Sequence, residues 1–223
     1  MRRSRANRNK STRPSGGARQ APSRQMRNPY APMQLINESQ LEDIHQASLK
    51  LLCDTGMDFQ SPQAVDILRC AGAMVHPDGQ RVRFDPDWVM QTIATTPREF
   101  VLHGRRPDRH IAMGGNSMAF AMVASTPNVS DLDRGRIAGN YDDFCNLLRL
   151  GESLNSVQLQ AGFPVEPCDV NVNTRHIIAG AAMARLTTKP VGGYALGRQR
   201  MQDVIDIVRI SRGIDHATLL QQP

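Results

Sequence analysis

The chain has few aromatic residues and no long apolar segment. Its 223 residues include six Phe, three Tyr and one Trp. No uninterrupted apolar run approaches the roughly 18 residues that a membrane-spanning helix needs, so the sequence predicts no membrane span. The length is sufficient to bury a full hydrophobic core in one or two domains.

The four cysteines lack the spacing of a metal site or of a disulfide framework. They are Cys53, Cys70, Cys145 and Cys168. None belongs to a Cys-x-x-Cys pair, and no histidine stands at ligand spacing from them. We therefore predict no metal site and expect the first three to be small core residues. Unpaired cysteines of this kind are typical of a reducing compartment, which predicts a cytoplasmic protein.

Acidic residues are absent from the first 28 positions. This segment holds nine Arg or Lys, so the remainder of the chain carries 18 basic against 21 acidic residues, a net charge of −3, although the whole chain has +6. Because residues 1–28 have almost no large apolar side chains, we predict a disordered basic tail. Nucleic-acid contact through this tail is an alternative, but the absence of interleaved aromatic residues argues against it. No apolar segment of a signal peptide follows Arg2-Arg3.

Residues 29–135 predict a small α+β region made of local units. Its helix starts are indicated by Ser39 with Glu42 as a capping box, and by the cap-plus-proline pairs Ser61-Pro62 and Asp85-Pro86. Turn signals predict a hairpin around residues 77–79, and another between residues 100–102 and 111–113. The stretch Asp131–Gly135 resembles the start of a calcium loop but lacks the later acidic ligands, which favours a polar turn.

Residues 136–223 alternate between strand-like and helix-like patterns. Asn140 can cap a first helix, a strand is expected at residues 157–161, and a second strand ends near residue 194. Each strand is followed by a helix-like run, as in a parallel α/β fold. The predicted fold class is therefore α/β, the start of a TIM (β/α)8 barrel preceded by a small α+β region. The barrel would be incomplete in this chain, which would make the chain a fragment.

Two segments follow the predicted strands at the end where such folds place their active sites. The first, residues 162–169, contains Glu166 and Asp169 on a proline-framed loop, and the second contains Tyr194. A carboxylate could hold a cation or act as an acid or base, and Tyr194 could present its ring face to a cation. The alternatives are that Glu166 is a solvated loop residue and Tyr194 a core aromatic residue.

Structural roles are also open for the residues that follow Glu166. Asp169 or Asn171 could cap the helix expected from about residue 172 to residue 186. His176, inside that helix, is expected to be structural. No Ser-His-Asp set, metal cluster or nucleotide-binding loop can be assembled from the sequence.

Several short stretches between residues 28 and 215 occur together in a recognisable order. They are Leu41–His45 with Leu51-Leu52 and Thr55-Gly56; Ile67-Leu68 with Ala71–Ala73; Val82–Phe84; Pro97–Phe100 with Leu102–Arg105; Asp131–Arg136; Pro164–Asp169; and Thr188–Pro190. In this order and spacing the chain resembles the trimethylamine methyltransferase family, the corrinoid-dependent methylamine and betaine methyltransferases.

The resemblance implies a cytoplasmic TIM-barrel transferase of methylamine metabolism, related to the enzymes of methanogenesis. Such an enzyme moves a methyl group from a methylated or quaternary amine, of the trimethylamine or betaine type, to the cobalt of a separate corrinoid protein. It carries no covalently bound corrinoid. The resemblance also implies that the catalytic position lies beyond Pro223, which leaves the catalytic residues of this chain unassigned. Glu166 and Tyr194 are the residues that we predict to bind the substrate.

Two other functions stay open on the sequence alone. One is an inactive remnant that binds an amine or a partner protein, and the other is nucleic-acid contact through the basic tail. An incomplete barrel would also expose an unpaired strand edge and apolar helix faces. We therefore expect the chain to aggregate or to associate with a partner, with a homo-oligomer among the expected states.

Overall fold

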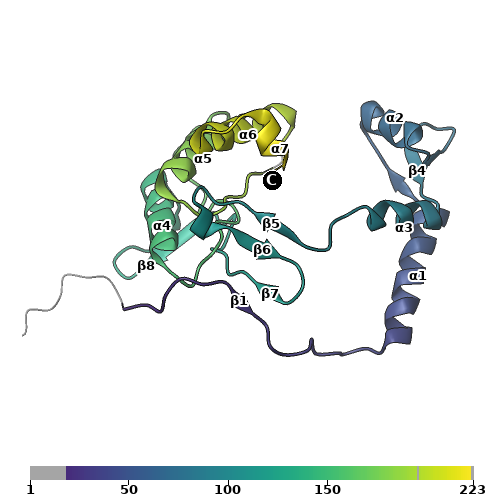
Figure 1. Ribbon diagram of the computed structural model, residues 1–223. Coiled ribbons are helices and arrows are strands. Elements are labelled where there is room, and N and C mark those ends of the chain that lie inside the picture. Colours follow the sequence, from purple (N-terminus) through teal and green to yellow (C-terminus); the bar gives the residue numbers. More distant parts are fainter. Residues whose placement is uncertain (1–18, 195, 222–223) are drawn as a thin grey trace, which may run out of the picture. The chain divides into compact units, whose positions relative to one another are not determined.

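The computed structural model describes residues 19–194 and 196–221. By their contacts these residues form two units, whose helices and strands are labelled in Figure 1. The small unit comprises residues 27–100 and 114–116, and the large unit comprises residues 19–26, 101–113 and the described residues from 117 onward. The sequence predicts a different boundary at residue 135, between an α+β region and the first units of a barrel domain. This boundary stays a prediction.

The small unit packs three helices around a three-stranded antiparallel sheet. The helices are α1 (Glu38–Asp54), α2 (Pro62–Cys70) and α3 (Pro86–Ala94), and the strands β2 (Met57–Asp58), β3 (Met74–Val75) and β4 (Arg81–Arg83) lie in the order β2-β4-β3. Val82 at the centre of β4 is fully buried, and Phe84 stacks on Trp88 with 5.9 Å between ring centroids. The predicted hairpin around residues 77–79 is confirmed, because β3 pairs with β4.

The helix starts of the small unit follow from local side-chain chemistry. Ser61 and Asp85 accept hydrogen bonds from backbone amides three residues later, with proline at the first helical position, as the sequence predicts. The capping box of α1 was placed wrongly, because it is formed by Asn37 and Gln40 rather than by Ser39 and Glu42. Both pairs have the same spacing, and only the extended backbone of Asn37 selects between them.

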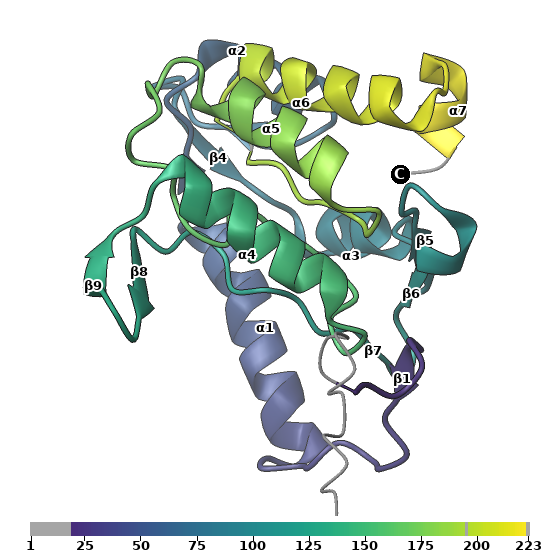
Figure 2. The ribbon, with the colours of Figure 1, turned by 90° about the vertical axis from the view of Figure 1, so that its left-hand side faces the viewer.

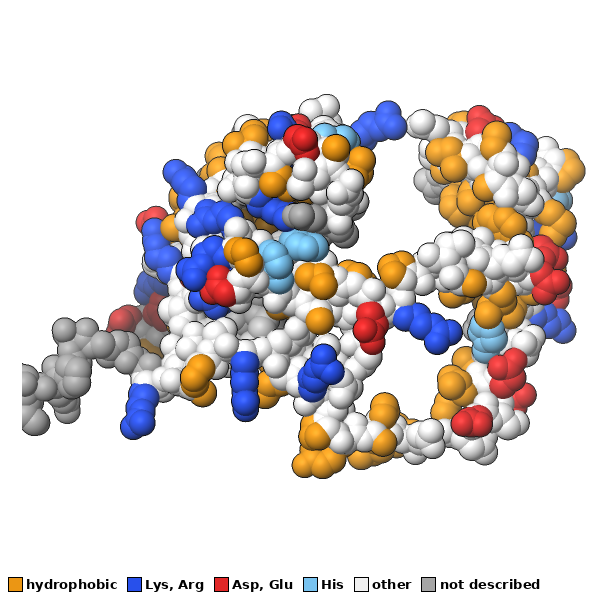
Figure 3. All heavy atoms as spheres, in the orientation of Figure 1, with side chains coloured by type: hydrophobic (Ala, Val, Ile, Leu, Met, Phe, Trp, Pro, Cys, Tyr) orange, Lys and Arg blue, Asp and Glu red, His pale blue; other side chains and the backbone are white. Residues whose placement is uncertain are grey.

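The α1 helix also carries an apolar stripe that its own unit does not cover. Leu41, Ile44 and Leu51 are each more than half exposed. Hydrophobic side chains are visible at the surface of the small unit in Figure 3. The spacing of these three residues places them on one face of the helix.

Three short strand pairs belong to the large unit, except for Arg27 and Phe100 at the ends of two strands. They are β1 (Met26–Arg27) with β7 (Ser117–Met118), β5 (Phe100–Leu102) with β6 (Ile111–Met113), and β8 (Asn128–Asp131) with β9 (Gly135–Ala138); the 3-10 helix η1 (Pro107–Arg109) lies between β5 and β6. The pairing of β5 with β6 confirms the second predicted hairpin.

The basic N-terminal segment is described only in part. Residues 1–18 lie outside the described residues, so their predicted disorder stays a prediction, whereas residues 19–28 are described and include β1. Gln20 accepts a hydrogen bond from the amide of Asn155 at 2.7 Å and donates one to the carbonyl of Ser153 at 2.8 Å. Gln25 similarly exchanges two hydrogen bonds with the backbone of Ala112. These side chains bind the segment to the large unit.

Four helices follow, and three of them lie side by side. They are α4 (Tyr141–Ser153), α5 (Arg175–Leu186), α6 (Arg198–Arg212) and the short α7 (His216–Gln221). Figure 2 shows α4, α5 and α6 next to one another in chain order. Asn140 caps α4 by accepting a hydrogen bond from the amide of Asp143 at 2.9 Å, as predicted.

Extended segments precede these helices and pair in parallel. Isolated parallel bridges join Ala121 to Leu159 and Gln160 to Val191. The amide of Gln160 donates to the carbonyl of Pro190 at 3.0 Å, and the amide of Gly192 donates to the carbonyl of Gln160 at 2.8 Å. Three extended segments, each followed by a helix, therefore lie in chain order. The TIM barrel itself stays a prediction.

The core of the large unit is formed by α4, α5 and the loop after the middle extended segment. Its buried residues are Phe144, Cys145, Leu148, Phe163, Val165, Ala179, Ala182 and Met183. Phe144 and Leu148 are fully buried. The ring of Phe144 meets the ring of Phe163 edge-on, with 5.4 Å between centroids. The core thus fixes the loop that carries Glu166 to the helix layer.

The Asp131–Gly135 stretch is a polar turn, as predicted. Asp131 accepts hydrogen bonds from the amides of Asp133 and Arg134 at 3.0 and 2.7 Å. Arg134 also binds Asp143 of α4, with 2.7 Å between Nη2 and Oδ1. The hydrogen bonds that Arg134 donates to the carboxylates of Asp143 and Asp131 raise its pKa above the ordinary value. The acidic side chains of this turn therefore serve an ion-pair network that joins the β8–β9 hairpin to α4.

Within residues 19–194 and 196–221, no helix is both long and apolar enough to cross a membrane. The same residues contain no group of three or more His, Cys, Asp or Glu side chains that could hold a metal ion.

Candidate functional site

A cavity of about 80 Å³ lies where the extended segments of the large unit end and α5 and α6 begin. We call it the Glu166–Tyr194 cavity. The side chains used below are Phe163, Glu166, Arg175, His176, Tyr194 and Arg200, all of which line it. The structure therefore brings the two residues predicted to bind substrate into the wall of one cavity. Their role in binding stays a prediction.

Tyr194 is held in a fixed orientation. Its phenolic oxygen is 2.6 Å from the hydroxyl of Ser125 and accepts a hydrogen bond from the amide of Phe163 at 3.0 Å. Its ring lies edge-on to Phe163, with 4.9 Å between centroids. A Cβ atom on Gly162 would lie 2.6 Å from the phenolic oxygen, so only glycine leaves room for this arrangement. The ring thus packs against the core and also lines the cavity.

Glu166 faces a partner of opposite charge. Its carboxylate lies 3.5 Å from Nη1 of Arg175, which is a long and weak contact for an ion pair. Arg175 is held instead by the carbonyl of Val170, to which its Nε and Nη2 donate at 3.2 and 2.9 Å. The Glu166 side chain is 26% exposed. Because Arg175 is anchored elsewhere, Glu166 keeps oxygen acceptors available for a cationic group.

Asp169, the second carboxylate of the predicted loop, is used elsewhere. Its Oδ1 accepts a hydrogen bond from the amide of Tyr141 at 2.8 Å and so stabilises the start of α4. The prediction that Asp169 or Asn171 caps the next helix is wrong, because Thr174 precedes α5 without a side-chain cap. Asn171 instead accepts from the amide of Asn173 at 2.9 Å. Asn171 thus binds a local backbone donor, whereas Asp169 binds one that lies 28 positions earlier in the chain.

His176 and Asp203 form a pair that sequence reasoning missed. Nε2 of His176 in α5 lies 2.9 Å from Oδ2 of Asp203 in α6, and the His176 side chain is only 11% exposed. The hydrogen bond from His176 holds the pKa of Asp203 below its ordinary value. The two residues are 27 positions apart, so no local pattern joins them. A histidine on an apolar helix followed by an acid on the next helix is the only signal available.

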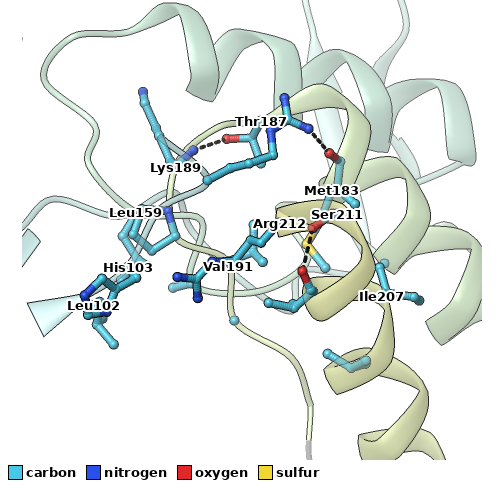
Figure 4. Close-up of a pocket in the computed structure, with 18 of the residues that line it drawn as sticks. Leu102, His103, Leu159, Met183, Thr187, Lys189, Val191, Ile207, Ser211 and Arg212 are labelled. Atoms are coloured by element: carbon cyan, nitrogen blue, oxygen red, sulfur yellow. Dashed lines mark hydrogen bonds between the residues drawn. The ribbon is translucent and has the colours of Figure 1, made fainter. Parts of the chain in front are cut away.

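A larger cavity of about 330 Å³ lies nearer the beginning of the same extended segments. Figure 4 shows its wall, which includes Leu159, Val191 and Ile207 as well as His103 and Arg212. Neither Glu166 nor Tyr194 lines it. Its walls are mainly apolar, and none of the described residues that line it has a carboxylate, so these residues offer no counter-charge to an amine cation.

A buried lysine closes one side of this larger cavity. Lys189 is 3% exposed, and its Nζ donates hydrogen bonds to the carbonyls of Leu154, at 2.8 Å, and Gly151 at the end of α4. Burial lowers the pKa of Lys189 to about 8, although the nearby Glu152 carboxylate opposes this shift. Lys189 thus satisfies carbonyls that the end of a helix leaves without intrahelical donors. Its role is to join the end of α4 to the start of the extended segment that contains Val191.

Glu152 secures the same junction. Its carboxylate accepts hydrogen bonds from the hydroxyls of Thr187 and Thr188 at 2.8 and 2.7 Å, and from the amide of Thr188 at 3.0 Å. Burial alone would raise the pKa of Glu152, but these hydrogen bonds outweigh it and hold the pKa below its ordinary value. The chemistry at this end of the unit is therefore structural.

Comparison with known proteins gives a consistent family. The family model described as trimethylamine methyltransferase (MTTB) matches residues 1–223. A glycine betaine methyltransferase of Desulfitobacterium hafniense (strain Y51) is 27% identical over 179 residues, which cover 80% of this chain and 37% of that protein. Trimethylamine methyltransferase MttB of Desulfitobacterium hafniense (strain DSM 10664 / DCB-2) is 24% identical over 157 residues, covering 70% and 32%. The matched parts thus span about a third of the length of these relatives.

Proposed function

The chain belongs to the trimethylamine methyltransferase family, and from this premise we propose that its protein moves a methyl group from a methylated or quaternary amine to the cobalt of a separate corrinoid protein. The substrate would be of the trimethylamine or betaine type, since relatives named for both substrates match the chain. A cytoplasmic location is part of the same proposal.

The observation that supports an amine site at particular residues is that Glu166 and Tyr194 line a single cavity. An alkylated ammonium group is stabilised by aromatic ring faces and by a nearby carboxylate. Tyr194 and Phe163 supply the aromatic surface, and Glu166 supplies the negative charge. We therefore propose this cavity as part of the amine site.

The chain's residues would orient the amine rather than react with it. The corrinoid cobalt supplies the nucleophile that accepts the methyl group. Holding the amine in one geometry lowers the entropic part of the barrier, and the fixed Tyr194 ring and the Glu166 carboxylate suit that task. No residue of this chain is assigned a catalytic role, and the catalytic position is proposed to lie beyond residue 223.

The fold proposal accompanies the functional one. The parallel bridges at Ala121–Leu159 and Gln160–Val191, each followed by a helix, support the first part of a TIM barrel. In such a barrel, active sites lie at the carboxyl ends of the strands. The Glu166–Tyr194 cavity lies at that end of the extended segments, as a substrate site would.

Replacing Glu166 by glutamine is expected to weaken the binding of glycine betaine to the purified chain by about tenfold. The substitution keeps the side-chain shape but removes the charge that attracts the ammonium group, and tenfold corresponds to about 1.4 kcal/mol. Isothermal titration calorimetry measures the change. Glu38→Gln, at an exposed position in α1, is the matched control and should leave binding unchanged. Equal affinity of the Glu166→Gln variant and the unsubstituted chain would remove Glu166 from the site.

Methyl transfer itself separates the leading function from the remnant alternative. The purified chain is incubated with glycine betaine or trimethylamine and a reduced corrinoid protein, and methylation of the cobalt is followed by its absorption spectrum. Transfer supports the methyltransferase. Amine binding without transfer is compatible with both functions, because the catalytic position is proposed to lie beyond residue 223, and the absence of both contradicts the amine site.

A further inference from the structure

Among the described residues that line the Glu166–Tyr194 cavity, His176 is the one with a buried polar side-chain atom that has no hydrogen-bond partner. Its Nε2 is bonded to Asp203, but its Nδ1 is buried and has no hydrogen-bond partner among the described residues. A buried polar atom without a partner is unfavourable, so a group that completes its hydrogen bonding, such as a bound ligand, ion or water, is expected beside it. The same ring lines the cavity.

The hydrogen-bond partner of Nε2 determines whether Nδ1 can donate or accept a hydrogen bond. Asp203 has a pKa below its ordinary value because of its hydrogen bond with His176, so it is ionised and can only accept. Nε2 must then carry the proton, and in the neutral imidazole Nδ1 is left with a lone pair. Such a nitrogen accepts a hydrogen bond from an N–H group. The remaining charged groups of the cavity wall are Glu166, Arg175 and Arg200.

We propose that His176, oriented by Asp203, accepts a hydrogen bond from the N–H group of a tertiary ammonium ligand in this cavity. A quaternary ammonium has no N–H, whereas the tertiary amine that remains after loss of one methyl group is protonated at neutral pH and has one. His176 would therefore distinguish the demethylated amine from its quaternary parent. The inference rests on the proposed amine site, and it assigns His176 a role in specificity rather than the structural role expected from the sequence.

The contrast between two ligands tests this role. Dimethylglycine carries an N–H and glycine betaine does not, while their carboxylates and carbon chains are the same. Calorimetry on the 223-residue chain should show that His176→Gln weakens dimethylglycine binding by about tenfold. Glycine betaine binding should change by no more than about twofold. His216→Gln, at an exposed position in α7, is the matched control and should affect neither ligand.

The other possible results of this experiment contradict either the role of His176 or the amine site itself. An equal loss for both ligands, or no loss for either, overturns the role of His176 and leaves the amine site standing. Binding of neither ligand to the unsubstituted chain contradicts the proposed amine site, and the inference with it.

A measurement on the unsubstituted protein adds an independent test that does not depend on the folding of a variant. Nitrogen-15 chemical shifts of the His176 ring should report a proton on Nε2 and a lone pair on Nδ1 at neutral pH. Adding dimethylglycine should shift the Nδ1 resonance, and adding glycine betaine should not. A ring protonated on Nδ1 with a bare Nε2 would overturn the inference directly.

Discussion

Replacement of Phe144 by alanine is expected to lower the free energy of unfolding by about 3–5 kcal/mol. The side chain is fully buried in the core of the large unit. Its ring contacts Phe163 edge-on and stacks on Tyr141 with 6.3 Å between centroids. Alanine would lose these contacts and leave a cavity that α4 and α5 cannot close without moving. Urea denaturation followed by circular dichroism measures the change.

Phe120→Ala is the matched control for this prediction. Phe120 also lies in the large unit, but it is 44% exposed, so the same substitution removes less buried area and creates no closed cavity. We expect it to cost about 1 kcal/mol. Comparable losses for the two variants would contradict the position of the core described above.

The second large effect concerns Lys189. Replacement by methionine is expected to lower the free energy of unfolding by about 2 kcal/mol at pH 7, because the carbonyls of Gly151 and Leu154 lose a buried donor. The methionine side chain keeps most of the volume, so packing is little changed. Lys50→Met, at an exposed position in α1, should cost almost nothing and serves as the control.

The contribution of Lys189 should also depend on pH in a defined direction. Its pKa is about 8 in the folded chain against 10.5 ordinarily, because burial disfavours the charged amine. Between these values the unfolded chain binds more protons, so the stability due to this group rises with pH from about 8 to 10.5 and is constant below that range. The neutral amine still has two N–H groups for the two carbonyls.

Comparison of the two proteins isolates this pH effect from all other titrating groups. The stability difference between the unsubstituted chain and Lys189→Met should widen as pH rises from 7.5 to 10. Urea denaturation at a series of pH values measures it. A difference that is constant or that narrows would show that the Lys189 amine is not buried in the folded chain.

The helix starts show which structural features can be predicted from local sequence and which cannot. Ser61, Asp85 and Asn140 were predicted as caps and act as caps, because a cap involves only residues within one turn. The predicted start of α1 is wrong because two residue pairs with the spacing of a capping box overlap there. The prediction that Asp169 caps α5 is also wrong, because Asp169 binds the amide of Tyr141, which lies 28 positions earlier. Spacing alone contains no information about such a distant donor.

The candidate site likewise contains some residues that the sequence could predict and others that it could not. Glu166 and Tyr194 could be selected from the sequence, because each follows a predicted strand at the end where parallel folds place their ligands. That they share one cavity depends on how the loop after residue 161 packs on Phe144 and Tyr194. The His176–Asp203 pair could not be selected, because it arises only when α5 and α6 pack side by side.

The sequence by itself determined the family resemblance of this chain, most of the local helix starts and the hairpins, and it predicts two residues for a cationic ligand. These features depend on residue types at short spacing or on motifs in a fixed order, and both can be read along the chain. Only the tertiary structure decided which carboxylate remains available in the cavity and which one caps a helix. It also decided that a histidine faces an acid from the next helix. Those outcomes depend on which donors and acceptors meet when distant segments pack, and burial then makes each unmatched polar group costly enough to select one arrangement.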